Sequence, residues 1–365
     1  MQRATPSLRT ILREWGRIGC VGFGGPPTHI ALLRQLCVVR EKWLDETEFE
    51  DAIAACNLLP GPASTQLSIF CAWRLRGLAG GLVGGFAFIL PGLGLILALS
   101  ALFLAHSAPL WVRGAAAGAG AGVAAVALQA GLGLVPASRA RASSQLRWFL
   151  YALAGGAAAA LVGPWLVVVL IGCGLVELAL RSFAAAVGGY GALAWVALKV
   201  GALSYGGGFV IVPLMQSDAV HRYHWLTNGQ FLNGVALGQI TPGPVVHTVA
   251  VVGYAAHGVA GGLFAAAIAF APSFLFVLVG GRYFDALRRD ERARSFLGGA
   301  GPAAIGAIVG SAIPLASALG AWWQFVLLAV AAVALLPLRR GVVPTLLGLG
   351  VAGAVLVATH AVSLS

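Results

Sequence analysis

Apolar residues form long continuous stretches along the chain, separated by short groups of charged, proline and glycine residues. A helix that crosses a membrane needs about 20 apolar residues, and most of these stretches are that long. Because the apolar runs are continuous rather than alternating, they predict helices and argue against a β-barrel. The stretches cover approximately residues 10–35, 49–73, 78–105, 109–135, 147–162, 164–180, 190–217, 231–255, 259–283, 296–320, 322–337 and 342–361.

The composition supports a membrane location. Of 365 residues, 59% are hydrophobic and only 10% are charged, and the mean hydropathy is +0.90. Soluble domains carry about 25% charged residues, so a soluble globule of this composition would lack polar surface. A chain this apolar is also not intrinsically disordered. We therefore predict an all-α polytopic membrane protein in the lipid bilayer, without a sizeable soluble domain.

The net charge of +11 is compatible with a polytopic membrane protein. The basic residues are spread over loops and form no stripe with interleaved aromatic residues, which indicates positive-inside loops rather than nucleic-acid binding. The five cysteines form no C-x-x-C pair, and the sequence contains neither a Walker loop nor an H-E-x-x-H motif. We expect no metal, no cofactor and no nucleic-acid partner. The sequence leaves the oligomeric state open, and a homo-oligomer is compatible with it.

The chain repeats itself after 182 residues. Trp43-Leu44 recurs as Trp225-Leu226, and the prolines and glycines recur in the same register. Many secondary transporters consist of two such related halves. The sequence predicts an N-terminal repeat over residues 1–182 and a C-terminal repeat over residues 183–365. The other matched motifs are Gly24-Gly25 with Gly206-Gly207 and Pro60-Gly61-Pro62 with Pro242-Gly243-Pro244.

Loop charges indicate how the halves are oriented. In the first half one set of alternate loops is rich in arginine. In the second half the loops that correspond to the other, arginine-poor set carry the arginines instead. If basic loops face the cytoplasm, the repeats are inverted. Inversion needs an odd number of crossings in the first half, so residues 147–180 would form one bent crossing or a hairpin. Parallel halves remain the alternative.

The motifs at the start of each half carry a family resemblance. The segment GFGGPPTHIALLRQLCVVREKWLDETEFEDAIAACNLLPGP begins at Gly22, and the second half repeats it as SYGGGFVIVPLMQSDAVHRYHWLTNGQFLNGVALGQITPGP. The F-G-G-P start, the W-L pair and the P-G-P ending resemble the chromate ion transporter family in its long-chain, two-domain form. The resemblance implies export of chromate from the cytoplasm across a bacterial inner membrane, which gives chromate resistance. The second half departs from the pattern, because Gly208 stands at the place of Pro26.

The repeated proline and glycine motifs predict broken helices. Proline removes a backbone donor, and backbone groups freed at membrane depth must be buried in protein or face water. A helix that restarts after such a break directs its N-terminal amides at the gap, which favours anions. The alternative is that these prolines and glycines form simple kinks, which only allow the helices to pack together. The predicted backbone part of a substrate site is Gly24, Gly25, Gly206, Gly207, Pro60, Gly61, Pro62, Pro242, Gly243 and Pro244.

Two pairs of side chains coincide in the repeat and complete the predicted substrate site. Arg17 and Lys199 lie in the opening apolar stretch of each half, where a buried cation should face the interior or water. Two such cations would balance a dianion, although Arg17 is also close enough to the N-terminus to reach a membrane surface. Asn57 and Gln239 each precede P-G-P by three residues. Their amides would donate to oxyanion oxygens or, alternatively, join two helices.

Three further residues receive weaker assignments. Arg40 and Arg222 match just before the tryptophans and would recruit anions at the mouth, unless they are ordinary loop charges. His247 follows the second P-G-P and is a candidate proton carrier, since imidazole changes its charge near neutral pH. A histidine in a membrane core more often serves as a hydrogen-bonding group.

Together these features predict a secondary transporter that exports chromate by alternating access. The inside-negative potential favours export of a dianion by about 4.6 kcal/mol per 100 mV, and proton exchange would add to this. Sulfate or another oxyanion on the same fold is the main alternative, because sulfate is also a tetrahedral dianion. A membrane enzyme is the other alternative. It would require a cluster of catalytic acids, histidines or metal ligands at membrane level, and no such cluster repeats or converges here.

Overall fold

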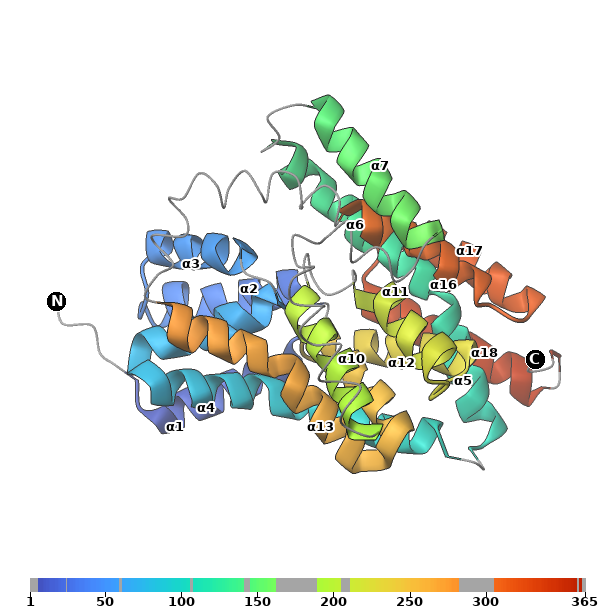
Figure 1. Cartoon of the computed structure of the whole chain (residues 1–365), viewed down its shortest axis with the longest axis horizontal. Coiled ribbons are helices and arrows are strands. Elements are labelled where there is room, and N and C mark those ends of the chain that lie inside the picture. Colours follow the sequence, from blue (N-terminus) through green and yellow to red (C-terminus); the bar gives the residue numbers. More distant parts are fainter. Residues whose placement is uncertain are drawn as a thin grey trace.

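A computed structural model of the chain describes residues 6–23, 25–58, 61–105, 108–140, 145–161, 189–204, 211–281, 305–359 and 361–362. Within these ranges the backbone is helical and contains no strand, as the apolar stretches predicted (Figure 1). The first half comprises α1 (Leu8–Val21), α2 (Pro26–Arg34), the π-helix η1 (Gln35–Arg40), α3 (Glu46–Leu58), α4 (Ala63–Phe103), α5 (Leu110–Ala121), α6 (Val123–Ala140) and α7 (Gln145–Leu161). The second half comprises α10 (Gly189–Leu203), α11 (Ile211–Gln216), the π-helix η3 (Ser217–Arg222), α12 (Asn228–Ile240), the 3₁₀-helix η4 (Val245–His247), α13 (Thr248–Gly280), α16 (Ala312–Ser317), α17 (Trp322–Leu335) and α18 (Val342–Ala358).

The two longest helices, α4 and α13, are helical hairpins. Each contains one glycine with a left-handed backbone, Gly77 with φ 58° in α4 and Gly258 with φ 61° in α13. After Gly77 the chain turns back on itself. The contact between the two arms shows this: a Cβ on Gly85 would lie 2.9 Å from Cγ1 of Ile69. Each hairpin therefore has a short arm, which follows P-G-P, and a long arm, which begins at the left-handed glycine. The long arm of α4, residues 77–103, extends about 40 Å, enough to cross a bilayer.

The backbone confirms the internal repeat. The π-helices η1 and η3 begin 182 residues apart, at Gln35 and Ser217. Left-handed residues recur in the same register, Lys42 with His224 and Gly61 with Gly243. Unusual backbone conformations at matched positions show that the halves share local structure as well as motifs.

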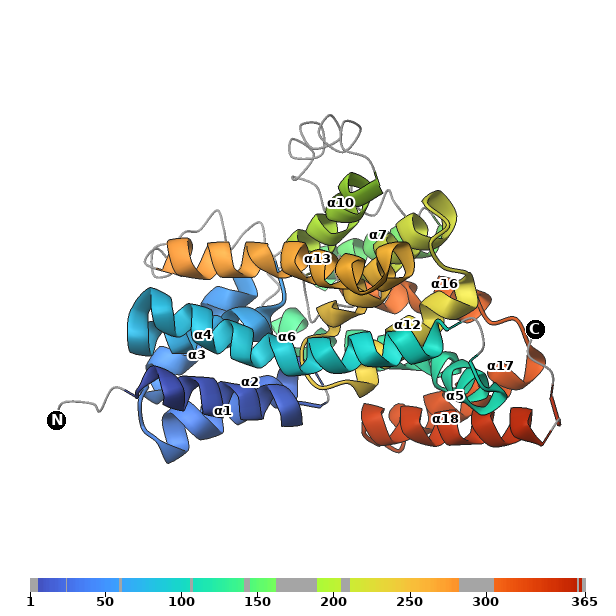
Figure 2. The same ribbon diagram turned by 90° about the horizontal axis from the view of Figure 1, so that it is seen from below.

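The repeats are inverted, as the loop charges predicted. A Cβ on Gly81 would meet Leu278, and a Cβ on Gly262 would meet Leu97, so the long arms of α4 and α13 run antiparallel. These two contacts exchange under the repeat, since Gly81 corresponds to Gly262 and Leu97 to Leu278. The halves are thus related by a two-fold axis perpendicular to the long arms. Figure 2 shows α4 in cyan and α13 in orange side by side.

The exposed surface of the long arms is apolar. In α4 large side chains four residues apart are exposed, namely Leu78, Leu82, Phe86 and Leu90. The opposite face carries glycines that allow close approach of neighbouring helices, Gly84 beside Trp15 of α1 and Gly85 beside Phe274 of α13. Within the described ranges, three helical segments are long and apolar enough to cross a membrane, namely Ala63–Phe103, Leu110–Ala140 and Val245–Gly280. This arrangement is that of a multi-pass membrane protein. Residues 162–188 lie outside the described ranges, so the course of the 147–180 region stays a prediction.

Candidate functional site

The two P-G-P turns meet the long arms of the opposite halves. A Cβ on Gly92, in the long arm of α4, would lie 2.0 Å from the carbonyl oxygen of Pro242. A Cβ on Gly61 would lie 3.2 Å from the hydroxyl of Ser273, in the long arm of α13. Gly92 and Ser273 correspond in the repeat, and both lie well inside their arms. The turns therefore meet at the interface of the halves, away from the ends of the long arms.

The turns follow from their sequence. Gly61 and Gly243 have φ angles of 123° and 105°, which glycine adopts without steric cost. Pro62 and Pro244 then cap the helices that follow, with φ of −72° and −67°. A preset φ and a missing N–H suit proline to this place. The N-termini of the short arms consequently lie at the turns, which confirms the predicted broken helices.

One carbonyl oxygen connects the two halves at this interface. The backbone N–H of Gly243 donates to the oxygen of Gly22 at 3.0 Å, and Nε2 of His29 lies 2.8 Å from the same oxygen. Since a carbonyl only accepts, Nε2 carries a proton. The Nδ1 atom of His29 lies 3.2 Å from the hydroxyl of Ser64, which donates to it when the imidazole is neutral. His29 thus fixes the end of α1 to the start of α4.

Several buried polar groups near the turns have no hydrogen-bond partner among the described residues. A buried polar group without a partner costs about 1–3 kcal/mol, so such a cluster points to a ligand. Most of these residues are within six positions of a P-G-P turn or contact one. They are Thr65 Oγ1, Ser68 Oγ, Ser204 Oγ, Gln239 Nε2, both ring nitrogens of His247, and Ser273 Oγ.

The imidazole of His247 is enclosed by glycines from both halves. A Cβ on Gly92 would lie 2.8 Å from its Cε1 atom, and a Cβ on Gly243 would lie 2.7 Å from it. The ring also contacts Phe270 edge-on, with the centroids 5.3 Å apart. The contact of His29 with Phe88 is similar, with the centroids 5.0 Å apart. Both histidines are fully buried beside the turns.

The predicted cations both form ion pairs. Arg17 lies 3.2 Å from Glu14 on α1 and exposes 56% of its side chain. Lys199 is paired with Asp218 of η3 and also lies over the ring of Trp195. These carboxylates, rather than the P-G-P turns, are the partners that the structure gives the two cations. A substrate-binding role for Arg17 and Lys199 stays a prediction.

The arginines predicted at the mouth differ from each other. Arg40 donates to Glu14 at 2.7 Å and to Glu41 at 2.8 Å, and these hydrogen bonds raise the pKa of Arg40. Arg222 lies over the ring of Tyr223 at 5.2 Å. Arg40 is therefore engaged by carboxylates, whereas Arg222 faces an aromatic ring.

The remaining predicted residues divide in two groups. Gln239 is buried with an unpartnered amide nitrogen, and Gly25 caps α2 with φ 75°. Gly24, Pro60, Gly206, Gly207 and the side chain of Asn57 lie outside the described residues. Ser68, Ser204 and Ser273 were not predicted as site residues from the sequence. Their only signal was position, since Ser204 corresponds to Gly22 in the repeat and Ser273 to Gly92.

Comparisons with known proteins agree with these features. The family described as Chromate transporter matches the chain twice, over residues 9–178 and over residues 191–356. A chromate transport protein of Cupriavidus metallidurans is 30% identical, over 91% of this chain and 88% of the relative. A chromate transport protein of Pseudomonas aeruginosa is 29% identical, over 82% of this chain and 79% of the relative. A probable chromate transport protein of Synechococcus elongatus is 27% identical, over 85% and 84%.

No solved structure matches this chain. The family match nevertheless covers most of the sequence and occurs once in each half, in agreement with the internal repeat. The relatives align over 79–88% of their own length. On these grounds the chain belongs to the chromate transporter family.

Proposed function

We propose that this protein exports chromate from the cytoplasm by alternating access around a cage at the P-G-P turns. The cage is defined as the two turns together with Thr65, Ser68, Gln239, His247 and Ser273. The observation that carries the proposal is the cluster of buried polar groups without partners at the interface of the two halves. Binding sites of inverted-repeat transporters characteristically lie at such an interface.

The chemistry of the cage suits a tetrahedral oxyanion. Hydroxyl groups, an amide nitrogen and imidazole nitrogens all can donate hydrogen bonds, and an oxyanion offers only acceptors. The N-termini of the short arms add backbone amides and a favourable dipole. No carboxylate belongs to the cage. Arg17, Lys199 and Asn57 enter the proposal as further substrate-binding residues, as the repeat predicted.

The arrangement of the turns also suits alternating access. Each turn rests on the long arm of the opposite half, through Gly92 in one case and Ser273 in the other. A rocking motion of one half against the other would therefore change both contacts and the Gly22–Gly243 hydrogen bond at once. Such motion opens the cage to one side of the membrane and closes it to the other.

Two sources of energy serve export. A charge of −2 gains about 4.6 kcal/mol per 100 mV when it leaves an inside-negative compartment. Proton exchange through His247 would add to this: burial disfavours the charged imidazole in the closed cage, so protonation would accompany the opening of the cage to water. We place the protein in the inner membrane of a bacterium, where such a potential exists.

The test is chromate uptake into everted membrane vesicles, with and without a membrane potential and a proton gradient. Uptake that depends on either gradient supports export by this protein. Vesicles that lack the protein provide the background, and sulfate uptake is measured in parallel. Accumulation of sulfate without chromate would overturn chromate as the substrate. It would favour another oxyanion, which the cage also suits because its donors contact the oxygens of the anion and not its central atom.

A further inference from the structure

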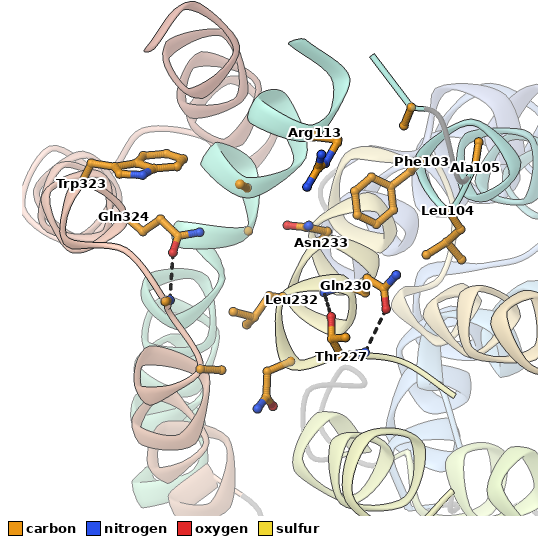
Figure 3. Close-up of a pocket in the computed structure, with 17 residues that line it drawn as sticks. Phe103, Leu104, Ala105, Arg113, Thr227, Gln230, Leu232, Asn233, Trp323 and Gln324 are labelled. Atoms are coloured by element: carbon orange, nitrogen blue, oxygen red, sulfur yellow. Dashed lines mark hydrogen bonds between the residues drawn. The ribbon is translucent and has the colours of Figure 1, made fainter. Parts of the chain in front are cut away.

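A cavity of about 840 Å³ lies apart from the cage, where the end of α4 meets the N-terminal ends of α5, α12 and α17 (Figure 3). Arg113 of α5 and Asn233 of α12 both extend into it. The cavity is lined by Arg113 and by neutral residues, of which Asn228, Gln230, Asn233 and Gln324 carry amide side chains. No acidic residue is among them.

Helix capping fixes which atoms of two glutamines face this cavity. The Oε1 atom of Gln230 accepts the backbone N–H of Thr227 at 2.9 Å. The Oε1 atom of Gln324 accepts the backbone N–H groups of Gly320 and Ala321, each at 3.0 Å. Because backbone N–H groups need acceptors, the oxygens of both side chains are committed to the helix ends. Their NH₂ groups, which only donate, are left for the cavity.

Asn228 and Arg113 add to this donor character. The Oδ1 atom of Asn228 accepts from Gln216 at 3.0 Å, which leaves its NH₂ group. Arg113 is exposed and forms no ion pair in the part of the chain that the structure describes. A cation surrounded by NH₂ groups, with no carboxylate, is a surface that attracts and hydrogen-bonds anions.

The internal repeat shows that this character is specific to the second half. The helix that corresponds to α12 is α3, and its first turns are acidic. Two of its carboxylates, Glu46 and Glu48, form ion pairs with Arg34 and Arg74. At each acidic position of residues 45–51 the second half has a neutral residue: Asp45, Glu46, Glu48, Glu50 and Asp51 correspond to Thr227, Asn228, Gln230, Leu232 and Asn233.

We propose that this cavity, the Arg113 vestibule, is a second oxyanion-binding site, where the transported anion docks before or after it occupies the cage. The inference rests on the proposed function for the identity of the anion. Helix α12 connects the two places, because Asn228 lines the vestibule and Gln239 belongs to the cage, about 16 Å further along the helix. Only one of the two repeat-related helix ends is suited to an anion, so the path is electrostatically asymmetric.

The direct test is equilibrium binding of labelled chromate and of labelled sulfate to the full-length protein in lipid nanodiscs. We expect Arg113→Gln to weaken one class of sites by about fivefold or more, and Arg113→Lys to preserve it. Asn233→Asp, which restores the charge of the repeat-related Asp51, should weaken the same class. Arg139→Gln is the matched control, because Arg139 of α6 lies over the ring of Trp148 of α7, outside the vestibule.

Ionic strength gives a readout that a merely structural effect would not change. The affinity of the wild-type vestibule for chromate or sulfate should fall as the salt concentration rises. In the Arg113→Gln variant the affinity should depend less steeply on salt concentration. Binding that is unaffected by both Arg113→Gln and Asn233→Asp overturns the vestibule. Arg113-dependent binding of an oxyanion without any chromate uptake into vesicles overturns the proposed export of chromate and supports the vestibule, so the two failures are distinguishable.

Discussion

Gly92 of the first half lies directly against His247 of the second half. A Cβ on Gly92 would be 2.8 Å from Cε1 of the imidazole and 2.0 Å from the carbonyl oxygen of Pro242. Backbone oxygen atoms move only with the whole turn, so no side-chain rotation relieves this contact. The close approach of the two halves at the cage thus depends on the absence of a single methyl group.

We therefore expect Gly92→Ala to reduce chromate uptake at least tenfold. The added methyl would push the second P-G-P turn away from α4 and displace His247. Gly94→Ala is the control, because a Cβ at Gly94 meets no atom within 4 Å. Uptake is measured in vesicles that contain equal amounts of each variant. Equal uptake by the two variants would contradict the close packing at the cage.

Gly77 makes a separate prediction about stability. A Cβ there meets no atom within 4 Å, but the φ of 58° is strained for any residue with a side chain. With ψ at −149° this backbone lies in a region essentially restricted to glycine, so Gly77→Ala should lower the free energy of unfolding by about 1–3 kcal/mol. The comparison is with Gly94→Ala, which adds the same methyl at an open helical position. Thermal unfolding of both variants in detergent measures the difference, and equal midpoints would contradict the hairpin geometry of α4.

The local backbone of this fold could be predicted from the sequence, whereas the contacts between the halves could not. Proline and glycine act on their own neighbourhood, so the repeated P-G-P motif predicted matching breaks, and loop arginines predicted the inversion. Gly92 is one of 51 glycines, and nothing in the surrounding sequence indicates that it contacts Pro242. The pairing of Lys199 with Asp218 was equally hidden, because the repeat places no carboxylate at the corresponding Leu36. Such contacts arise only when distant segments fold together.

Gln239 tests the donor role of the cage. Its Nε2 atom is buried without a partner among the described residues, so truncation of the side chain breaks no hydrogen bond that the structure assigns to that atom. A hydrogen bond to a charged ligand contributes about 1.5–3 kcal/mol, so Gln239→Ala should weaken chromate binding by roughly 10- to 100-fold. Gln129→Ala is the control, since Gln129 donates to the carbonyl of Leu335 at 3.3 Å. The measurements are the half-saturation concentration for uptake and the amount of protein in the membrane. Unchanged half-saturation in the Gln239 variant would place the site elsewhere.

Lys199 separates a structural role from a role in binding. Lys199→Ala leaves Asp218 without its cation in a largely buried place, so the amount of folded protein should fall. The double variant with Asp218→Ala removes both charges and should recover the protein level. The repeat predicts that the positive charge of Lys199 binds the transported anion. We therefore expect the double variant to take up chromate about tenfold more slowly than the wild type, or slower still. Recovery of full uptake would assign Lys199 to the ion pair alone.

His247 tests the proton coupling. Neither ring nitrogen has a side-chain hydrogen-bond partner among the described residues, the backbone of Ile89 lies beside the ring, and the ring lies between the two halves. His247→Asn keeps a donor amide but cannot exchange a proton near neutral pH. We expect this variant to retain uptake driven by the membrane potential and to lose the stimulation by a proton gradient. His29→Asn is the matched comparison, because His29 is bonded to Gly22 and Ser64, and its loss should reduce uptake under either driving force. Proton stimulation that persists in the His247 variant would exclude His247 as the proton carrier while leaving its place in the cage intact.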